Sequence, residues 1–108
     1  MITYNTPLLA SSIFNAAIEL NFYEFRLKWN TTNSSWYIDI YNTNGVISTG
    51  VKILPYTNIF RYRKDLSSKG IFTVINIKNS KEPLGRNNLG YGKDYLFVYM
   101  TNEELGNG

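Results

Sequence analysis

Carboxylates are the first side chains to consider for acid–base chemistry, because the sequence contains neither histidine nor cysteine. The missing histidine removes the commonest general base, and the missing cysteine removes the thiol nucleophile and a usual zinc ligand. A pair of carboxylates is the catalytic device of most glycosidases. However, Glu19, Glu24 and Asp39 lie on expected strand faces whose opposite sides are apolar, which indicates a solvated face. We therefore expect no catalytic residue and no enzymatic activity.

The remaining acids and the glycines do not indicate a bound ion or nucleotide. Asp65, Glu82 and Asp94 lie in or beside expected loops, without a second acid at the spacing of a calcium-binding loop. The glycine-rich segment 85–92 lacks the Gly-Lys-Ser/Thr ending of a phosphate-binding loop, and no helix is expected after it. Turn formation is the better interpretation, so the sequence predicts no metal site and no cofactor.

Aromatic and basic residues alternate in segment 55–69, and three interpretations compete. In the first, the segment is a connection whose Ile59, Phe60 and Leu66 cover an open end of a barrel while the basic groups are solvated. In the second it is a docking surface, because aromatic residues and arginine are enriched at interface hot spots. In the third it is a platform for single-stranded nucleic acid, which uses the same residue types. The docking interpretation assigns partner binding to Tyr56, Phe60, Arg61, Tyr62 and Arg63, with Arg86 in the later loop 79–92.

The stretch 23–54 supplies the elements that would position this segment. Apolar and polar residues alternate with period two in residues 23–29 and again in 36–41, which predicts half-buried strands. We expect Trp29 and Trp36 to face the core. Asn44-Gly45 predicts a type I′ hairpin turn into a return strand over 46–54, in which Gly50 marks a bulge or a close approach.

Three further strands complete the expected fold. Residues 13–20 favour helix by propensity, but the run is short and leads directly into the next strand, so we expect a strand hairpinned to 23–29. Residues 71–78 and 93–100 are apolar on both faces, which suggests a subunit interface. We predict one all-β domain over residues 1–108, a small antiparallel β-barrel or β-sandwich of six or seven strands built on a meander. Residues 1–12 would be an N-terminal extension, and 101–108 a C-terminal tail.

Composition agrees with this fold class and narrows the list of partners. The chain has 108 residues, enough for one domain with its own core, and its nine tyrosines and six phenylalanines suit a pleated surface. It contains no stretch long enough to span a membrane and no signal-peptide pattern, so we expect synthesis in a cytoplasm. The net charge of +3 is modest for a dedicated nucleic-acid binder.

Several segments, taken in order, resemble the bacteriophage baseplate plug family. They are the strand–turn–strand 25–40 with its two tryptophans, the turn at Asn44-Gly45, the strand Gly50-Val51-Lys52-Ile53-Leu54-Pro55, the loop 83–90 reading PLGRNNLG, and a final strand closing on Val98-Tyr99. The likeness covers about residues 13–100.

This resemblance implies a structural, non-catalytic component of a contractile phage tail baseplate. Its partners would be the hub, spike and tail-tube proteins, and its location the virion, after synthesis in the host cytoplasm. Two alternatives stay open from the residues themselves. One is a β-barrel that binds single-stranded nucleic acid through the aromatic and basic loop, and the other is a carbohydrate- or receptor-binding module that uses exposed aromatic rings.

Overall fold

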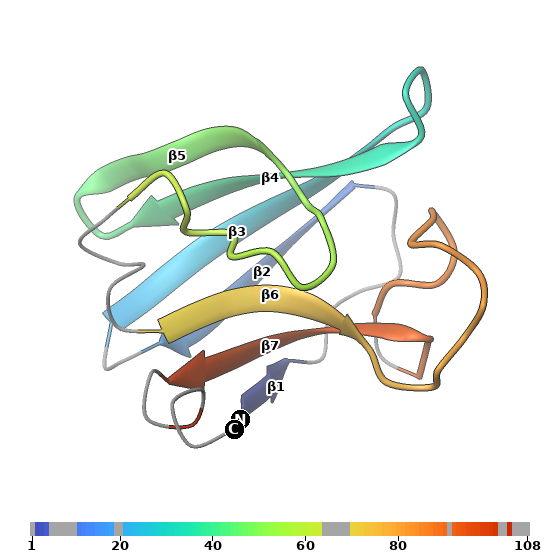
Figure 1. The fold of residues 1–108 in the computed structure, drawn as a ribbon. Helices are drawn as coiled ribbons and strands as arrows, with labels where there is room; N and C mark the ends of the chain where they lie inside the picture. Colours follow the sequence, from blue (N-terminus) through green and yellow to red (C-terminus); the bar gives the residue numbers. More distant parts are fainter. Residues whose placement is uncertain are drawn as a thin grey trace.

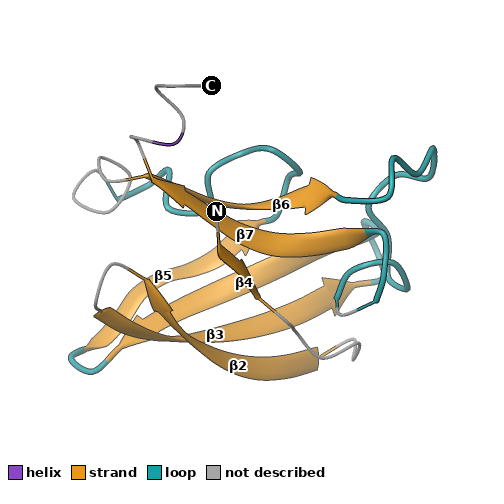
Figure 2. Cartoon of the chain, turned by 90° about the horizontal axis from the view of Figure 1, so that it is seen from below, coloured by secondary structure: helices purple, strands orange, loops and turns teal. Residues whose placement is uncertain are grey.

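The computed structural model describes residues 2–4, 11–18, 21–63, 70–90, 92–101 and 104. Across these residues the chain forms seven β-strands in two antiparallel sheets (Figure 1). The sheets lie as two layers that do not close into a barrel, an arrangement compatible with a β-sandwich (Figure 2). The expected all-β fold is confirmed. The strands are β1 (Ile2–Tyr4), β2 (Ser11–Ile18), β3 (Asn21–Asn30), β4 (Ser35–Asn42), β5 (Gly45–Lys52), β6 (Gly70–Asn76) and β7 (Tyr95–Thr101).

The larger sheet is the expected meander, extended by one strand to the order β2-β3-β4-β5. The strand expected over 13–20 is confirmed as β2, which pairs with β3 without a register break from Ser11 opposite Lys28 to Ile18 opposite Asn21. Helix propensity is overridden here because alternate β2 side chains are buried against the core. The smaller sheet has the order β1-β7-β6. Most of the expected extension 1–12 and tail 101–108, and Leu66 with its neighbours, lie outside the described residues.

The β4–β5 hairpin differs from its prediction at the turn. The turn consists of Thr43 and Asn44 between the paired residues Asn42 and Gly45, so the predicted type I′ turn on Asn44-Gly45 is wrong. A type I′ turn needs positive φ at both central residues, whereas neither Thr43 nor Asn44 has it. The Asn42 side chain instead accepts the Asn44 N–H at 2.9 Å, which is an Asx turn.

The bulge predicted at Gly50 is confirmed. Gly50 has a φ of +62°, and the pairing of β4 with β5 shifts register between Ile38 and Ile40. The Gly50 N–H donates to the Asp39 carboxylate at 2.7 Å, so the bulged backbone has a partner on the neighbouring strand.

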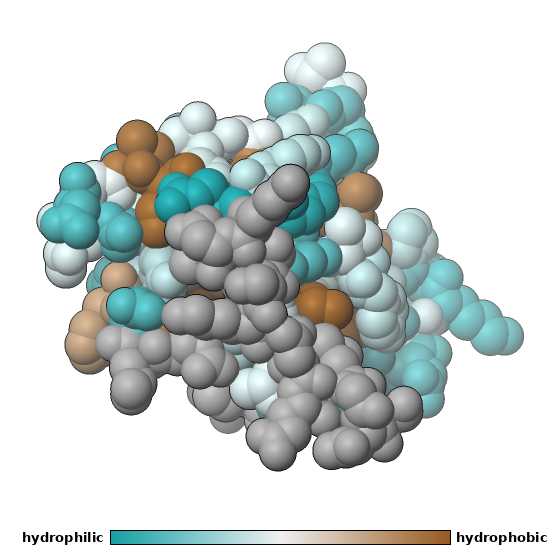
Figure 3. Space-filling view, turned by 60° about the vertical axis from the view of Figure 1, so that its left-hand side comes forward, coloured by the Kyte–Doolittle hydropathy of each residue, from teal (hydrophilic) through white to brown (hydrophobic). Residues whose placement is uncertain are grey.

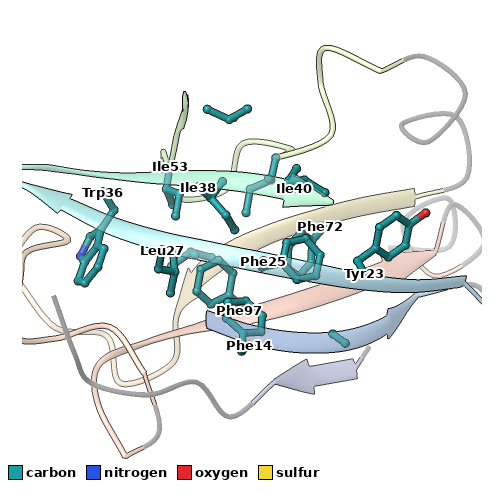
Figure 4. Packing of buried hydrophobic residues seen from close by; sticks show 14 of the residues in the cluster. Phe14, Tyr23, Phe25, Leu27, Trp36, Ile38, Ile40, Ile53, Phe72 and Phe97 are labelled. Carbon is teal, nitrogen blue, oxygen red and sulfur yellow. The ribbon is translucent and has the colours of Figure 1, made fainter. Parts of the chain in front are cut away.

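Aromatic rings from both sheets meet in the core (Figure 4). Phe72 lies 4.9 Å from Phe25 and 5.6 Å from Phe97 between ring centroids, and Phe14 lies 5.3 Å from Phe97. Such offset and tilted pairs stabilise beyond the area they bury. These contacts join the four-stranded sheet to the three-stranded sheet.

Both tryptophans lie on the core side of the larger sheet. Trp36 is buried, and its indole N–H donates to the Gly85 carbonyl at 2.9 Å. Trp29, paired with Trp36 across β3 and β4, packs edge-on against it at 5.3 Å between ring centroids but is only partly buried. The expectation that both face the core is therefore confirmed for Trp36 and holds in part for Trp29.

The outward side of β6 and β7 is apolar as well, which was the reason to suspect a subunit interface. Val98 on this side is fully buried, and its other apolar residues are half-buried: Ile71, Ile75, Leu96 and Met100. On the face shown in Figure 3, hydrophobic residues stand in separate patches between hydrophilic ones.

Replacing Gly70 with alanine is expected to lower the free energy of unfolding by about 1–3 kcal/mol, the usual cost of overpacking. A Cβ at Gly70 would collide with the Met100 carbonyl oxygen and lie 2.7 Å from the Tyr99 hydroxyl. The Met100 oxygen belongs to the backbone, so a rotamer change cannot relieve this collision. Urea unfolding followed by tryptophan fluorescence would measure the effect. The matched control is Gly85→Ala, whose Cβ meets nothing closer than 3.8 Å, and an equal loss in both variants would contradict this account.

Candidate protein-docking surface

Segment 54–63 links the two sheets, and it begins with a turn that holds Tyr56 in an unusual conformation. The Thr57 N–H donates to the Leu54 carbonyl at 3.1 Å across Pro55 and Tyr56. Proline suits the first central position of a type II turn, and the second position needs positive φ and usually holds glycine. Tyr56 occupies that position with a φ of +62°, while its side chain remains 65% exposed. The turn thus presents an aromatic ring to solvent at the expense of backbone strain.

The next residues lie along the free edge of β6 and are fixed there by Asn58. Its side-chain oxygen accepts the N–H groups of Phe60 and Phe72, each at 3.1 Å. The Ile59 N–H also donates to the Phe72 carbonyl at 2.7 Å. As a result Ile59 and Phe60 are buried, as the first interpretation of this segment expected.

Phe60 therefore does not belong to the exposed part of the predicted docking set. Its ring packs against Phe72 at 5.5 Å and against Tyr23 at 5.7 Å between centroids, and only 3% of the residue is exposed. The alternation of aromatic and basic residues could not separate a core ring from a surface ring. The direction of the Phe60 side chain is decided by the two residues before it, because Ile59 and Asn58 are hydrogen-bonded to the backbone of Phe72 on β6.

Arg61 and Arg63 reach from this segment to the open edge of β5. Arg61 donates to the Lys52 carbonyl at 2.8 Å and to the Asn58 carbonyl at 3.0 Å. Arg63 donates to the Ile47 carbonyl at 3.4 Å. Guanidinium groups on the outward carbonyls protect an edge strand from pairing with another chain. Both arginines are half-buried, so they are not simply solvated.

Tyr62 completes a small exposed cluster at this edge. It is 70% exposed, and the Arg61 guanidinium lies 4.9 Å from the centroid of its ring, a cation–π contact. We call the group formed by Lys52, Arg61, Tyr62 and Arg63 the β5-edge surface. Sequence reasoning missed Lys52, because its contact with Arg61 runs through a backbone carbonyl.

Arg86 lies in a different place, in the loop between β6 and β7. This loop is ordered by its own side chains, since Asn88 accepts the Gly85 N–H at 2.7 Å and donates to the Pro83 carbonyl at 2.9 Å. Arg86 is exposed and lines a groove of about 600 Å³ beside Trp29. The structure thus brings Arg61, Tyr62 and Arg63 together but does not join Arg86 to them.

A second groove, of about 380 Å³, adjoins the β5-edge surface at Lys52. Its floor includes the buried side chains of Trp36 and Ile53, and its walls include Leu54 and Leu84. Lys52 is its one charged lining residue among those the structure describes. We call it the Leu84 groove.

Charges are distributed differently on the outer face of the four-stranded sheet. There Arg26 pairs with Glu24 at 2.8 Å, and Lys28 lies 3.8 Å from Asp39. The pKa of Arg26 is raised above its ordinary value, chiefly because its side chain is hydrogen-bonded to Glu24. Arg26 also stacks on Tyr41 at 4.3 Å. Acids and bases neutralise each other on this face, whereas Lys52 and Arg61 of the β5-edge surface have no carboxylate partner among the described residues.

A family model described as Cyanophage baseplate Pam3 plug gp18 matches residues 1–103. The chain belongs to this family. The resemblance to baseplate plugs that the sequence predicts is confirmed, and the match extends beyond residues 13–100 at both ends. Membership in the baseplate plug family indicates a structural role in a phage baseplate, as a component of the virion tail. Among curated proteins, no match to the chain is found.

A baseplate plug needs surfaces that contact its neighbours. No three acidic side chains of the described residues come together as metal ligands. In the same part of the chain, no helix is long and apolar enough to cross a membrane. The exposed aromatic and cationic side chains are the residue types that serve protein interfaces.

Tyr56→Gly is expected to be more stable than Tyr56→Ala by about 1 kcal/mol, because an L-residue in the left-handed region bears that cost and glycine does not. Both substitutions remove the ring and the hydrogen bond from the Asn76 N–H to the Tyr56 hydroxyl, so their difference isolates the backbone. Thermal unfolding of the two variants would measure it. If alanine were the more stable replacement, the plug would not hold residue 56 at positive φ.

Proposed function

We propose that this chain is a plug-like structural protein of a contractile phage tail baseplate, packed near the central hub, the spike and the start of the tail tube. The observation that carries the proposal is the family match over residues 1–103. The chain acts as a single β-domain through protein–protein contacts and catalyses no reaction. It is made in the host cytoplasm and carried in the virion.

The contacts are proposed at two places. One is the β5-edge surface with the nearby Tyr56, and the other is the groove beside Arg86. Arginine and tyrosine are frequent anchors of interfaces because they combine large contact area with directed hydrogen bonds. Arg61 adds to this, since its guanidinium is held in place before any partner arrives.

Quantitative mass spectrometry of purified tails tests the proposed role. We expect the chain at a few copies per tail, in a constant ratio to the hub protein across independent preparations. A non-structural protein of the same phage serves as the control for contamination. If the chain is depleted along with that control during purification, the baseplate role is wrong.

Location within the tail is tested separately by residue-specific cross-linking. Amine-reactive reagents of short span should join the chain to hub, spike or tail-tube proteins. Links confined to proteins of the head or the fibres would contradict a central position while leaving a virion role intact.

A further inference from the structure

We propose that the β5-edge surface binds an acidic segment of a neighbouring baseplate protein, with an apolar side chain of that segment in the Leu84 groove. The inference rests on the proposed function and adds the chemistry of the partner. The occupant is a protein segment that carries at least one carboxylate beside an apolar residue.

The first argument is an imbalance of charge. Lys52 and Arg61 lie together on the β5-edge surface, where the Arg61 guanidinium donates to the Lys52 carbonyl. On the outer face of the four-stranded sheet, by contrast, Arg26 and Lys28 each lie beside an acid. Neither Lys52 nor Arg61 has a carboxylate within ion-pair distance among the described residues. Two neighbouring cations without a carboxylate partner, Lys52 and Arg61, favour an acidic binding partner, because complementary potentials steer association and penalise wrong partners.

The second argument is the fixed position of the Arg61 guanidinium. Two backbone carbonyl oxygens accept hydrogen bonds from it, that of Lys52 at 2.8 Å and that of Asn58 at 3.0 Å. A guanidinium has several N–H donors in one plane, so donors remain that match a carboxylate. Because the side chain is already ordered, binding loses less conformational entropy than it would with a mobile arginine.

The third argument is the apolar groove next to these cations. Leu54, which is 41% exposed, and the half-buried Leu84 stand over the floor formed by Trp36 and Ile53. Lys52 lines the same groove. An apolar side chain entering the groove would place the next residue of an extended segment near the Lys52 ammonium. This arrangement combines a desolvated anchor with a charged rim, the usual anatomy of an interface.

Single-stranded nucleic acid fits the same surface less well. A base-stacking platform uses several aromatic faces, whereas Tyr62 is the one ring of the β5-edge surface and the Arg61 guanidinium covers one of its faces. Arg61 is also tied to backbone carbonyls instead of being free to follow a phosphate chain. The lining of the Leu84 groove includes two leucines, two prolines and an isoleucine, which suit an aliphatic side chain.

Carbodiimide cross-linking in purified tails tests the inference, because this reagent couples an amine directly to a carboxylate. We expect a link from Lys52 to an aspartate or glutamate of another tail protein. Lys52→Arg should abolish that link yet keep the protein in the tails, since it preserves the charge and removes the amine. Lys52→Glu, supplied to a phage that lacks the native gene, should lower incorporation into tails at least tenfold.

The matched control is Lys81→Glu, which makes the same charge change at an exposed lysine that lines neither groove. Thermal unfolding should show that the Lys52→Glu and Lys81→Glu variants are both folded. The inference is overturned if tails hold the native chain without a Lys52 link. It is also overturned if Lys52→Glu is incorporated to the same extent as Lys81→Glu. Either result leaves the proposed function intact. Release of the chain from tails by nuclease also overturns the inference, in favour of nucleic acid. A chain absent from the tails overturns the proposed function and the inference together.

Discussion

Replacing Phe72 with alanine will lower the free energy of unfolding by about 3–5 kcal/mol, the range measured for phenylalanine truncation in protein cores. The Phe72 side chain is fully buried, and its ring contacts Phe25 of the other sheet, Phe97 of the adjacent strand and Phe60 of the linking segment. Truncation therefore opens a cavity where three structural units meet. Urea unfolding followed by circular dichroism would measure the loss.

Phe22→Ala provides the comparison for the same change of side chain. Phe22 lies on the outer side of β3 and is 72% exposed, so its truncation should change stability by less than about 0.5 kcal/mol. Similar losses in the two variants would show that the interior is not centred on Phe72. A loss confined to Phe72→Ala would confirm that one aromatic cluster joins both sheets.

The large sheet could be predicted because its signals are local. Residues 23–29 alternate strictly, and the buried members Tyr23, Phe25 and Leu27 fall on one side as period two requires. Strand β2 was harder to predict, since its two alanines and the Glu19 that follows it in sequence favour helix. Its assignment depended on the short distance to the following strand, which leaves room only for a tight hairpin.

The β4–β5 turn shows where local signals fail. Asn44-Gly45 is a strong hairpin signal, yet the turn forms one residue earlier. The register of β5 is set by its bulge at Gly50 and by the need to bury Val51 and Ile53, and the turn residues adapt to that register. A long-range constraint thus decides the geometry of a short-range element.

Composition singled out three members of the β5-edge surface but did not predict how they are arranged. Arg61, Tyr62 and Arg63 are neighbours in sequence, so grouping them required no structure. Lys52 joins them only because segment 54–63 folds back along β5, where the side chains of Arg61 and Arg63 donate to backbone carbonyls of that strand. The same folding buries Phe60. No pattern of residue types encodes such contacts, because any residue supplies a carbonyl.

Asn58→Ala is expected to lower the free energy of unfolding by about 2–4 kcal/mol, because it leaves two enclosed backbone N–H groups without an acceptor. Those groups belong to Phe60 and Phe72, and the Asn58 side-chain oxygen receives both at 3.1 Å. Denaturant unfolding would measure the loss. Asn58→Asp is the matched comparison, since it keeps the accepting oxygen; it also loses the longer bond to the Gly70 carbonyl at 3.4 Å and adds a negative charge.

Asn58→Ala should also weaken binding at the β5-edge surface, although it changes none of the side chains of that surface. The Asn58 carbonyl receives Arg61 through both its backbone N–H and its guanidinium, so a shift of residue 58 moves the guanidinium away from the Lys52 carbonyl. We expect Asn58→Ala, tested at a temperature where it remains folded, to be incorporated into tails less well than Asn58→Asp. Equal incorporation of the two variants would mean that the position of Arg61 does not matter for docking. The partner would then recognise the β5-edge surface only through its overall positive charge.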